Sequence, residues 1–244
     1  TGQLTVAGAL TGNGALVNSG TLDVIAGSFT GLTSVTNTGN INVTGQTLGG
    51  NLIHNGGTVT LTGGTIGGTT NIAGGATLTA LGASTLGGAT VNGGVINLAD
   101  GAADDVLTVN GNLNSTGTIN LDVSLNSPVP AVDTIVVNGG LSGTINVAFT
   151  SLGAGTFDTP GNTLVISSTG NTATIGTVTG LPVNPFVNHN LVNLGNNVVI
   201  NTSLNLGPVG GLVGSLTASQ NLINAAVNRP GSAFVATPIG VDAD

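Results

Sequence analysis

A five-residue motif recurs six times in the first hundred residues, and it constrains the fold more than any other feature of the chain. A glycine is followed by apolar and polar residues in alternation, as in Gly2-Gln3-Leu4-Thr5-Val6. Successive lead glycines are separated by 18, 19, 18, 18 and 19 residues, the later ones being Gly20, Gly39, Gly57, Gly75 and Gly94. A fixed period of this length is typical of repeat proteins, in which each repeat is one small structural unit that stacks on the next.

Each period contains two further apolar positions, which predicts three short strands per repeat. The second position is occupied by Phe29, Leu48, Ile66 and Leu86, and the third by Val17, Val35, Ile53, Ile72 and Val91. Strands that alternate apolar and polar residues bury one face, and glycine at the corners permits sharp turns. The repeat therefore predicts a coil with three sides.

Stacking of these coils predicts the core, because one coil cannot bury its own apolar side chains. We expect one internal ladder of the residues that follow the lead glycines, namely Leu22, Ile41, Val59, Leu78 and Ile96. Each buried side chain of this kind contributes about 1.5–3 kcal/mol. The predicted fold is all-β: a parallel β-helix, right-handed because right-handed crossovers dominate parallel connections, with a regular stalk over residues 1–98.

The repeat changes character after residue 98. The motif recurs at Gly117 and Gly143 at longer intervals, with apparent extra strands at 106–109 and 134–137. We interpret residues 99–206 as irregular coils that form a C-terminal cap, since an open last coil would expose a strand edge. Residues 207–244 are predicted to be a linker that contains one short helix over 217–227, with Thr217 or Ser219 as N-cap and Pro230 after its end.

The composition excludes several classes of function. The net charge is −8, and the one basic residue among the 244 is Arg229, so the cationic cluster that nucleic acids or anionic membranes require is missing. No apolar run is long enough for a transmembrane helix, and without cysteine the chain has neither disulfides nor thiolate metal ligands. No Gly-x-Ser-x-Gly nucleophile motif occurs, and the basic residues that pectate-lyase-type β-helices use beside Ca²⁺ are lacking. We therefore predict a non-enzymatic protein with no catalytic residues and no cofactor.

Two histidines and one acidic cluster are the candidate sites in the sequence. We interpret His54 as an exposed turn residue, because it aligns with Asn18, Thr36, Ala73 and Asn92 after the third apolar position, and His189 in the same way. Asp100, Asp104 and Asp105 either bind Ca²⁺ or belong to an ordinary loop at the end of the stalk, and they have neither the spacing of an EF-hand nor the nonapeptide of calcium β-rolls. No metal ligand is assigned.

Outward-facing threonines suggest an alternative function. Thr58 and Thr60 in one coil and Thr77 and Thr79 in the next resemble the ice-binding face of β-helical antifreeze proteins. The neighbouring coils carry Asn and Asp at these places, and asparagine ladders also stabilise stacked strands by hydrogen bonding. An ice- or glycan-binding β-solenoid is therefore the alternative to a structural stalk.

The chain as a whole resembles the passenger segment of a classical bacterial autotransporter (type V secretion). The coils are similar to the passenger stalk of that family. The two segments that begin at Asp105 and Asp133, Asp-Val-Leu-Thr-Val-Asn-Gly and Asp-Thr-Ile-Val-Val-Asn-Gly, resemble the doubled units of its autochaperone region. Residues 221–224 and 229–235 look like the linker that precedes the translocator.

The resemblance implies a location and a role. It implies a stalk on the bacterial cell surface or released outside the cell, anchored through an outer-membrane β-barrel that this sequence does not contain, so that the sequence would be a fragment of a longer protein. It also implies that the C-terminal coils act as a folding template during export. Adhesion to a host surface or glycan is a further expected role, while nucleic-acid binding and membrane insertion by this segment are not expected.

Overall fold

The computed structural model describes residues 2–125, 130–153 and 160–227. The chain divides into two units, Thr1–Ser203 and Leu204–Asp244. The first unit is a parallel β-solenoid of about six turns, and it ends in antiparallel strands. The predicted parallel β-helix is therefore confirmed.

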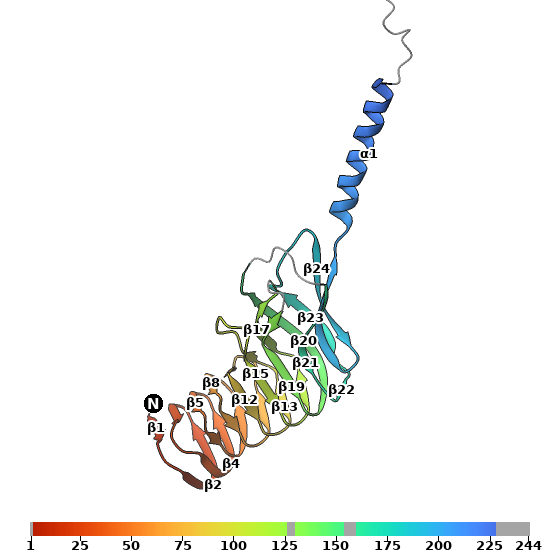
Figure 1. The fold of residues 1–244 in the computed structure, drawn as a ribbon. Helices are drawn as coiled ribbons and strands as arrows, with labels where there is room; N and C mark the ends of the chain where they lie inside the picture. The colour runs from red at the N-terminus through yellow and green to blue at the C-terminus, as the bar shows by residue number, and fades with distance from the viewer. Residues whose placement is uncertain (1, 126–129, 154–159, 228–244) are drawn as a thin grey trace, which may run out of the picture. The chain divides into compact units, whose positions relative to one another are not determined.

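The strands of the solenoid form three stacks, one for each side of a coil (Figure 1). The first stack contains β1 (Gln3–Val6), β3 (Thr21–Val24), β5 (Asn40–Thr44), β8 (Thr58–Thr62), β11 (Thr77–Leu81), β14 (Val95–Asn97), β17 (Thr118–Ser124), the second half of β20 (Gly140–Ser151) and β23 (Thr174–Thr179). The second stack contains β6 (Thr47–Leu48), β9 (Thr65–Ile66), β12 (Ala83–Leu86), β15 (Val106–Val109), β19 (Thr134–Val137) and β21 (Gly161–Ser167). The third stack contains β7 (Asn51–His54), β10 (Thr70–Ile72), β13 (Thr90–Asn92), β16 (Leu113–Ser115), the start of β20, and β22 (Gly170–Asn171). In the first two coils, β2 (Leu10–Asn18) and β4 (Phe29–Asn37) each run through both the second and the third stack.

The predicted core ladders of the first and second stacks are confirmed. Leu22 pairs with Ile41, and the parallel register continues through Val59 and Leu78 to Ile96, all with at most 1% of their surface exposed. In the second stack, Phe29, Leu48, Ile66 and Leu86 lie in register and are buried. The apolar residues two positions further along the first stack form another buried ladder: Val24, Val43, Leu61, Ala80 and Leu98.

The predicted inward ladder of the third stack is wrong for three of its five members. Val17, Ile53 and Val91 point outward and are 75%, 39% and 49% exposed, whereas Val35 and Ile72 are buried. Val35 pairs with Leu52 rather than with Ile53. In the coil of β7 the inward residue is therefore Leu52, one position earlier than predicted. A strand that contains two adjacent apolar residues fits either register, and a shift of one residue reverses every side chain.

The lead glycines stack where neighbouring coils approach closely. A Cβ atom on Gly57, whose φ is +73°, would lie 2.1 Å from the carbonyl oxygen of Gly39. In the next coil the equivalent position is occupied by Ala76, since Thr77 pairs with Thr58. The assignment of Gly75 as a lead glycine is therefore off by one residue.

The strands predicted as extra elements at 106–109 and 134–137 are regular members of the second stack. These are β15 and β19, and they pair with each other in register from Val106 and Thr134 onward. The additional strands lie elsewhere: β18 (Ala131–Val132) pairs antiparallel with β17, and β25 (Asn197–Leu204) pairs antiparallel with β21. The strand β24 (Val187–Leu194) lies beside β23.

The helix of the second unit, α1 (Gly207–Val227), begins ten residues before the predicted start. Thr217 and Ser219 therefore lie inside the helix rather than at its N-cap, and the segment at 207–211, predicted as a linker, is helical. The carbonyl oxygen of Leu206 accepts the first helical hydrogen bond, from the N–H of Gly210 at 2.9 Å, and the side chain of Asn205 accepts one from the N–H of Gly207 at 3.2 Å. A proline at position 208 is compatible with a first turn because its missing N–H would have no partner there.

Candidate functional site

A column of mostly polar side chains runs inside the solenoid at the corner between the third stack and the next coil. We call it the corner column; its positions are in register and are occupied by Asn18, Asn37, His54, Ile72, Asn92 and Ser115, so that the apolar Ile72 interrupts the polar series. Asn37, His54, Asn92 and Ser115 are fully buried. Buried polar groups are costly unless hydrogen-bonded, so each must find partners within the column or on the backbone.

The asparagines of the corner column bridge one coil to the next and also cap their own turn. The amide nitrogen of Asn18 donates to Oδ1 of Asn37 at 2.7 Å and to the carbonyl oxygen of Asn40 at 2.9 Å. Oδ1 of Asn37 also accepts from the N–H of Gly39, two residues later, at 3.2 Å. Asn92 repeats the pattern with Gly94, Ser115 and the carbonyl oxygen of Thr118. The Asn-x-Gly spacing at each corner is the sequence signal that identifies these residues.

His54 is a member of this column, so its interpretation as an exposed turn residue is wrong. Its Nδ1 lies 3.2 Å from the amide nitrogen of Asn37, which also donates to the carbonyl oxygen of Gly39, and its Nε2 lies 2.9 Å from the carbonyl oxygen of Thr77. A carbonyl only accepts and an amide NH₂ only donates, so these partners assign the neutral tautomer with the proton on Nε2. Burial lowers the pKa of His54, while the contacts with Thr77 and Asn37 act in the opposite direction.

A second buried polar group lies where the doubled segments stack, and it contains Asp105, Asp122 and Asp133. All three are at most 3% exposed. Asp133 accepts the N–H of Asp105 on one oxygen at 3.0 Å and the N–H of Asp122 on the other at 2.6 Å. In turn, Asp105 accepts the N–H of Gly82 at 2.5 Å, and Asp122 accepts the N–H groups of Asp100 and Gly101 at 2.8 and 2.6 Å. Each carboxylate therefore ties together backbone segments that are distant in sequence.

The environment disfavours the ionised form of two of these carboxyl groups, those of Asp133 and Asp105. Burial raises the pKa of Asp133 to about 7, although its bonds to the N–H groups of Asp122 and Asp105 act in the opposite direction. Burial also raises the pKa of Asp105, and the neighbouring Asp100, Asp104 and Asp122 add to that effect. One oxygen each of Asp105 and Asp122 is buried without a hydrogen-bond partner. Protonation of Asp105 or Asp133 is one way to relieve such a site.

The structure places the acidic residues that the sequence grouped as a possible Ca²⁺ site in different environments. Asp105 is buried, whereas Asp100 and Asp104 are exposed. In the described part of the chain, no three His or Asp side chains are arranged to hold a metal ion. Sequence reasoning missed Asp122 and Asp133 as partners of Asp105, because only the stacking of coils brings them together.

His189 also differs from its prediction as an exposed turn residue. It lies in β24, is partly buried, and its Nδ1 is 3.0 Å from the hydroxyl oxygen of Thr202 in β25. Each histidine therefore lies in a strand and has its own hydrogen-bond partners, and the two are in separate parts of the solenoid.

The outer surface carries hydroxyl ladders on two sides. On the first stack, Thr58 pairs with Thr77 and Thr60 with Thr79, as the alternative function requires. On the second stack, a longer run that sequence reasoning missed places four threonines in register: Thr47, Thr65, Thr85 and Thr108. All of these side chains are partly exposed.

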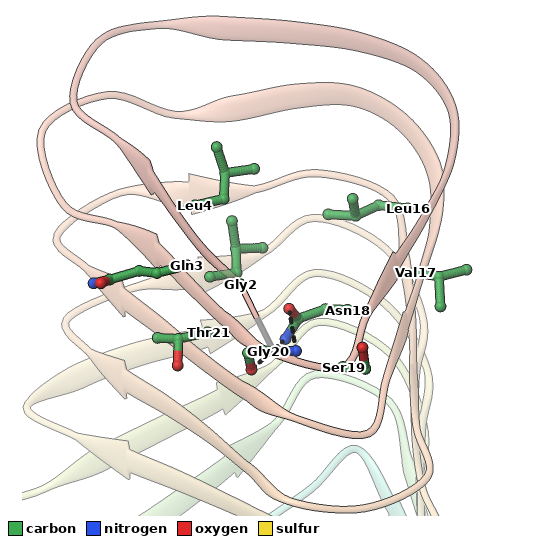
Figure 2. Close-up of a pocket in the computed structure, with 10 residues that line it drawn as sticks. Gly2, Gln3, Leu4, Leu16, Val17, Asn18, Ser19, Gly20 and Thr21 are labelled. Atoms are coloured by element: carbon green, nitrogen blue, oxygen red, sulfur yellow. Dashed lines mark hydrogen bonds between the residues drawn. The ribbon is translucent and has the colours of Figure 1, made fainter.

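The first coil forms an open depression at the end of the solenoid (Figure 2). It is lined by Gly2, Gln3, Leu4, Leu16, Val17, Asn18, Ser19, Gly20, Thr21 and Leu22. The polar atoms of Asn18 lie at its edge beside Gly20, and the first strand lies on its other side.

The chain matches no known protein-family model and no curated protein. Within the residues that the structure describes, no helix has both the length and the apolarity needed to cross a membrane. The function must therefore be argued from the architecture itself.

Proposed function

We propose that this protein is a non-enzymatic structural stalk of a secreted or surface-displayed autotransporter passenger, whose C-terminal coils template the folding of the others. The observation that carries the proposal is the difference between the two ends of the solenoid. At the C-terminal end, β24 and β25 provide a cover whose residues Leu191, Val198 and Ile200 are at most 7% exposed. At the other end, Leu4 and Leu10 are 45% and 40% exposed.

This difference supports folding from the C-terminal end. In a solenoid each coil is stabilised by its neighbours, and folding propagates from whichever coil is already stable. The covered end has antiparallel pairing between β21 and β25 in addition to the parallel stacks, so it needs no further coil to bury its core. The two doubled segments that resemble the autochaperone region stack directly on each other as β15 and β19. A chain that leaves a membrane pore with this end first would present a finished template to the coils that follow.

Pulse-labelled hydrogen exchange during refolding of the whole chain tests the template. We expect the amides of β20, β21 and β25 to gain protection before those of β3, β5 and β8. A substitution in the cover, Ile200→Asp, should delay protection of the early coils, whereas Ser203→Asp, on the partly exposed face of β25, should not. Early protection of β3 and β5, unaffected by Ile200→Asp, would refute the template role.

The export role is tested in a longer chain that carries a translocator. Deletion of residues 99–206 should abolish export and leave the remaining stalk sensitive to protease. Normal export of a protease-resistant product after this deletion would contradict the proposal. In the same setting the helical segment after the solenoid would serve as linker to the outer-membrane partner, and surface labelling of intact cells would report the proposed location.

The threonine ladders support a second candidate, binding of ice or of a repetitive glycan. Thr47, Thr65, Thr85 and Thr108 form an uninterrupted uncharged row with the spacing of stacked strands, about 4.8 Å. This candidate predicts thermal hysteresis or glycan binding that is lost in the double variant Thr65→Lys/Thr85→Lys. The same change at Thr60 and Thr79, on the first stack, shows which of the two stacks carries the activity. Absence of both activities in the unmodified chain would leave the stalk as the function.

A further inference from the structure

Two side chains of the first coil are exposed at positions whose partners in the next coil are buried. Leu4 is 45% exposed, while Leu22, the next residue of its ladder, is 1% exposed. Leu10 is 40% exposed, and its partner Phe29 is 6% exposed. The exposed surface therefore has the same composition as the contact between two coils, with an apolar centre on the first and second stacks.

Among the residues that the structure describes, no other strand pairs with the opposite edge of β1. Its pairing with β3 uses the carbonyl oxygens of Gly2 and Val6, which accept from the N–H groups of Thr21 and Ile25. Because neighbouring residues of a strand direct their backbone groups to opposite edges, Gln3 and Thr5 present theirs to the open edge. Such an edge can form a regular parallel ladder with another strand, in which each residue of β1 has one partner.

The corner column gives this end a more specific requirement. Oδ1 of Asn37 accepts two hydrogen bonds, one from the N–H of Gly39 and one from the amide of Asn18 in the preceding coil. Oδ1 of Asn18 accepts the equivalent bond from the N–H of Gly20 at 3.3 Å, and no bond to it from a side chain is present among the described residues. A carboxamide oxygen has two acceptor sites. Asn18 is therefore arranged to receive one side-chain amide from above.

We infer that the open face of the first coil is a docking surface for a β-coil segment of the same repeat class. The segment has an uncharged sequence of the Gly-x-apolar-x-apolar type and an Asn two residues before the glycine that follows it. Its first strand pairs parallel with β1, its apolar residues cover Leu4 and Leu10, and its Asn donates to Oδ1 of Asn18. The inference depends on the solenoid geometry and not on the proposed export role.

Charge and topology favour this occupant over others. The acid nearest to the face is Asp23, which points outward and already accepts hydrogen bonds from Gln3 and Asn42. The described part of the face carries no basic side chain, so a charged ligand would find no opposite charge there. The covered end of a second copy offers antiparallel strands rather than a free parallel coil, so copies cannot continue the stack head to tail.

The test adds such a coil to the chain. A copy of residues 20–38 is inserted between Thr1 and Gly2, which keeps the 19-residue spacing of the lead glycines and places the copied Asn37 above Asn18. A matched control carries Leu22→Asp and Val24→Asp in the copy alone, at positions that face the core. A second variant carries Asn37→Ala in the copy. Amide exchange of Gln3 and Thr5, measured by NMR, is the readout, and the protection of Val59 reports that the original coils remain folded.

The docking surface predicts that the inserted copy slows exchange of Gln3 and Thr5 at least about tenfold, as for amides that enter a stable ladder. The control insert leaves both amides fast. Loss of the copied Asn37 reduces the protection about fivefold, as expected for one buried hydrogen bond. Equal protection by the copy and its control, or by neither, overturns the inference. Exchange of Gln3 and Thr5 in the unmodified chain that slows with protein concentration would also overturn it, because the occupant would then be a second copy.

Discussion

Protonation affects the buried histidine and the buried carboxyl groups in opposite directions. His54 is a neutral base between Asn37 and Thr77, and both of its ring nitrogens are used in that form. Asp133 is an acid that two backbone N–H groups hold beside Asp105 and Asp122. Burial disfavours the charged form of either residue. The solenoid is therefore expected to be sensitive to acid at His54 and to neutral or alkaline pH at Asp133.

Replacement of His54 by Asn should remove one acid-sensitive group while retaining the chemistry of the corner column. Because the pKa of His54 is lowered in the folded chain, its contribution to stability is present above the unfolded value near 6.5 and is lost as the pH falls through the folded value. The unfolding free energy of the original chain should therefore decrease relative to His54→Asn between pH 7 and pH 5, as measured by urea denaturation. At pH 7.5 the variant should be within about 2 kcal/mol of the original. Parallel stability curves for the two proteins would contradict the burial of His54.

Asp133→Asn should have the opposite effect on the pH profile. A pKa raised to about 7 contributes stability that is complete below the unfolded value near 4 and is lost as the pH rises to about 7, by as much as about 4 kcal/mol. The original chain should lose stability over this range, and Asp133→Asn should not. In acid the variant should be less stable by about 1–2 kcal/mol, because its NH₂ group faces a backbone N–H. Asp104→Asn removes one exposed acid and should retain the original profile; a profile that flattens equally in Asp104→Asn would contradict the assignment to Asp133.

At the scale of single strands, the alternation between core and surface decides which substitutions the coils tolerate. Val59 is fully buried, and Thr60, the next residue of β8, faces outward between Asn42 and Thr79. Adjacent residues of one strand thus provide a direct test of register.

Val59→Asp should prevent stable folding of the central coils, or cost more than about 4 kcal/mol, because it places an unpaired charge in the core. Thr60→Asp should change stability by about 0.5 kcal/mol or less. Circular dichroism during thermal unfolding measures both. Similar melting of the two variants would mean that the inward register of β8 is wrong.

The corner glycine Gly57 provides a second test at this scale. Alanine at position 57 would have a positive φ of +73° and a Cβ 2.1 Å from the carbonyl oxygen of Gly39. We expect Gly57→Ala to cost about 2–3 kcal/mol. At Gly56, where nothing lies within 4 Å of a Cβ, alanine should be nearly neutral. An equal effect of the two changes on urea midpoints would show that coils do not approach each other at Gly57.

The sequence predicts the first two stacks well because a glycine fixes the position of their apolar residues, as at Leu22 and Ile41. It fails in the third stack, where Leu52 and Ile53 are adjacent and either could face the core. The same one-residue error in register led to the prediction that His54 is exposed. The start of the helix is missed because Gly207 and its neighbours favour a flexible segment by composition, whereas the structure has them in the first turns of the helix. The carboxyl group at Asp133 is not predictable from one sequence, since its partners are brought to it only by the stacking of coils.

At the scale of the molecule, the two ends of the solenoid differ while its middle is uniform. The parallel stacks continue from β1 to β23; a short antiparallel strand, β18, is added beside β17, and the long antiparallel strand β25 pairs with β21 at the C-terminal side (Figure 1). Each coil contacts its neighbours, so local changes are transmitted along the stack rather than across a single core. This organisation suits a stalk that presents a long surface. It also means that His54 and Asp133 belong to separate, distant coils of the same solenoid.

Distances between spin labels along one outward ladder test the stacked parallel coil most directly. The chain has no cysteine, so Thr21→Cys can be combined in turn with Thr77→Cys, Val95→Cys and Thr118→Cys, which lie three, four and five coils away. Pulsed electron–electron double resonance should give separations of about 14, 19 and 24 Å for these three pairs, in equal steps of about 4.8 Å. Separations that do not increase by one strand spacing per coil would contradict the solenoid, and with it the proposed stalk.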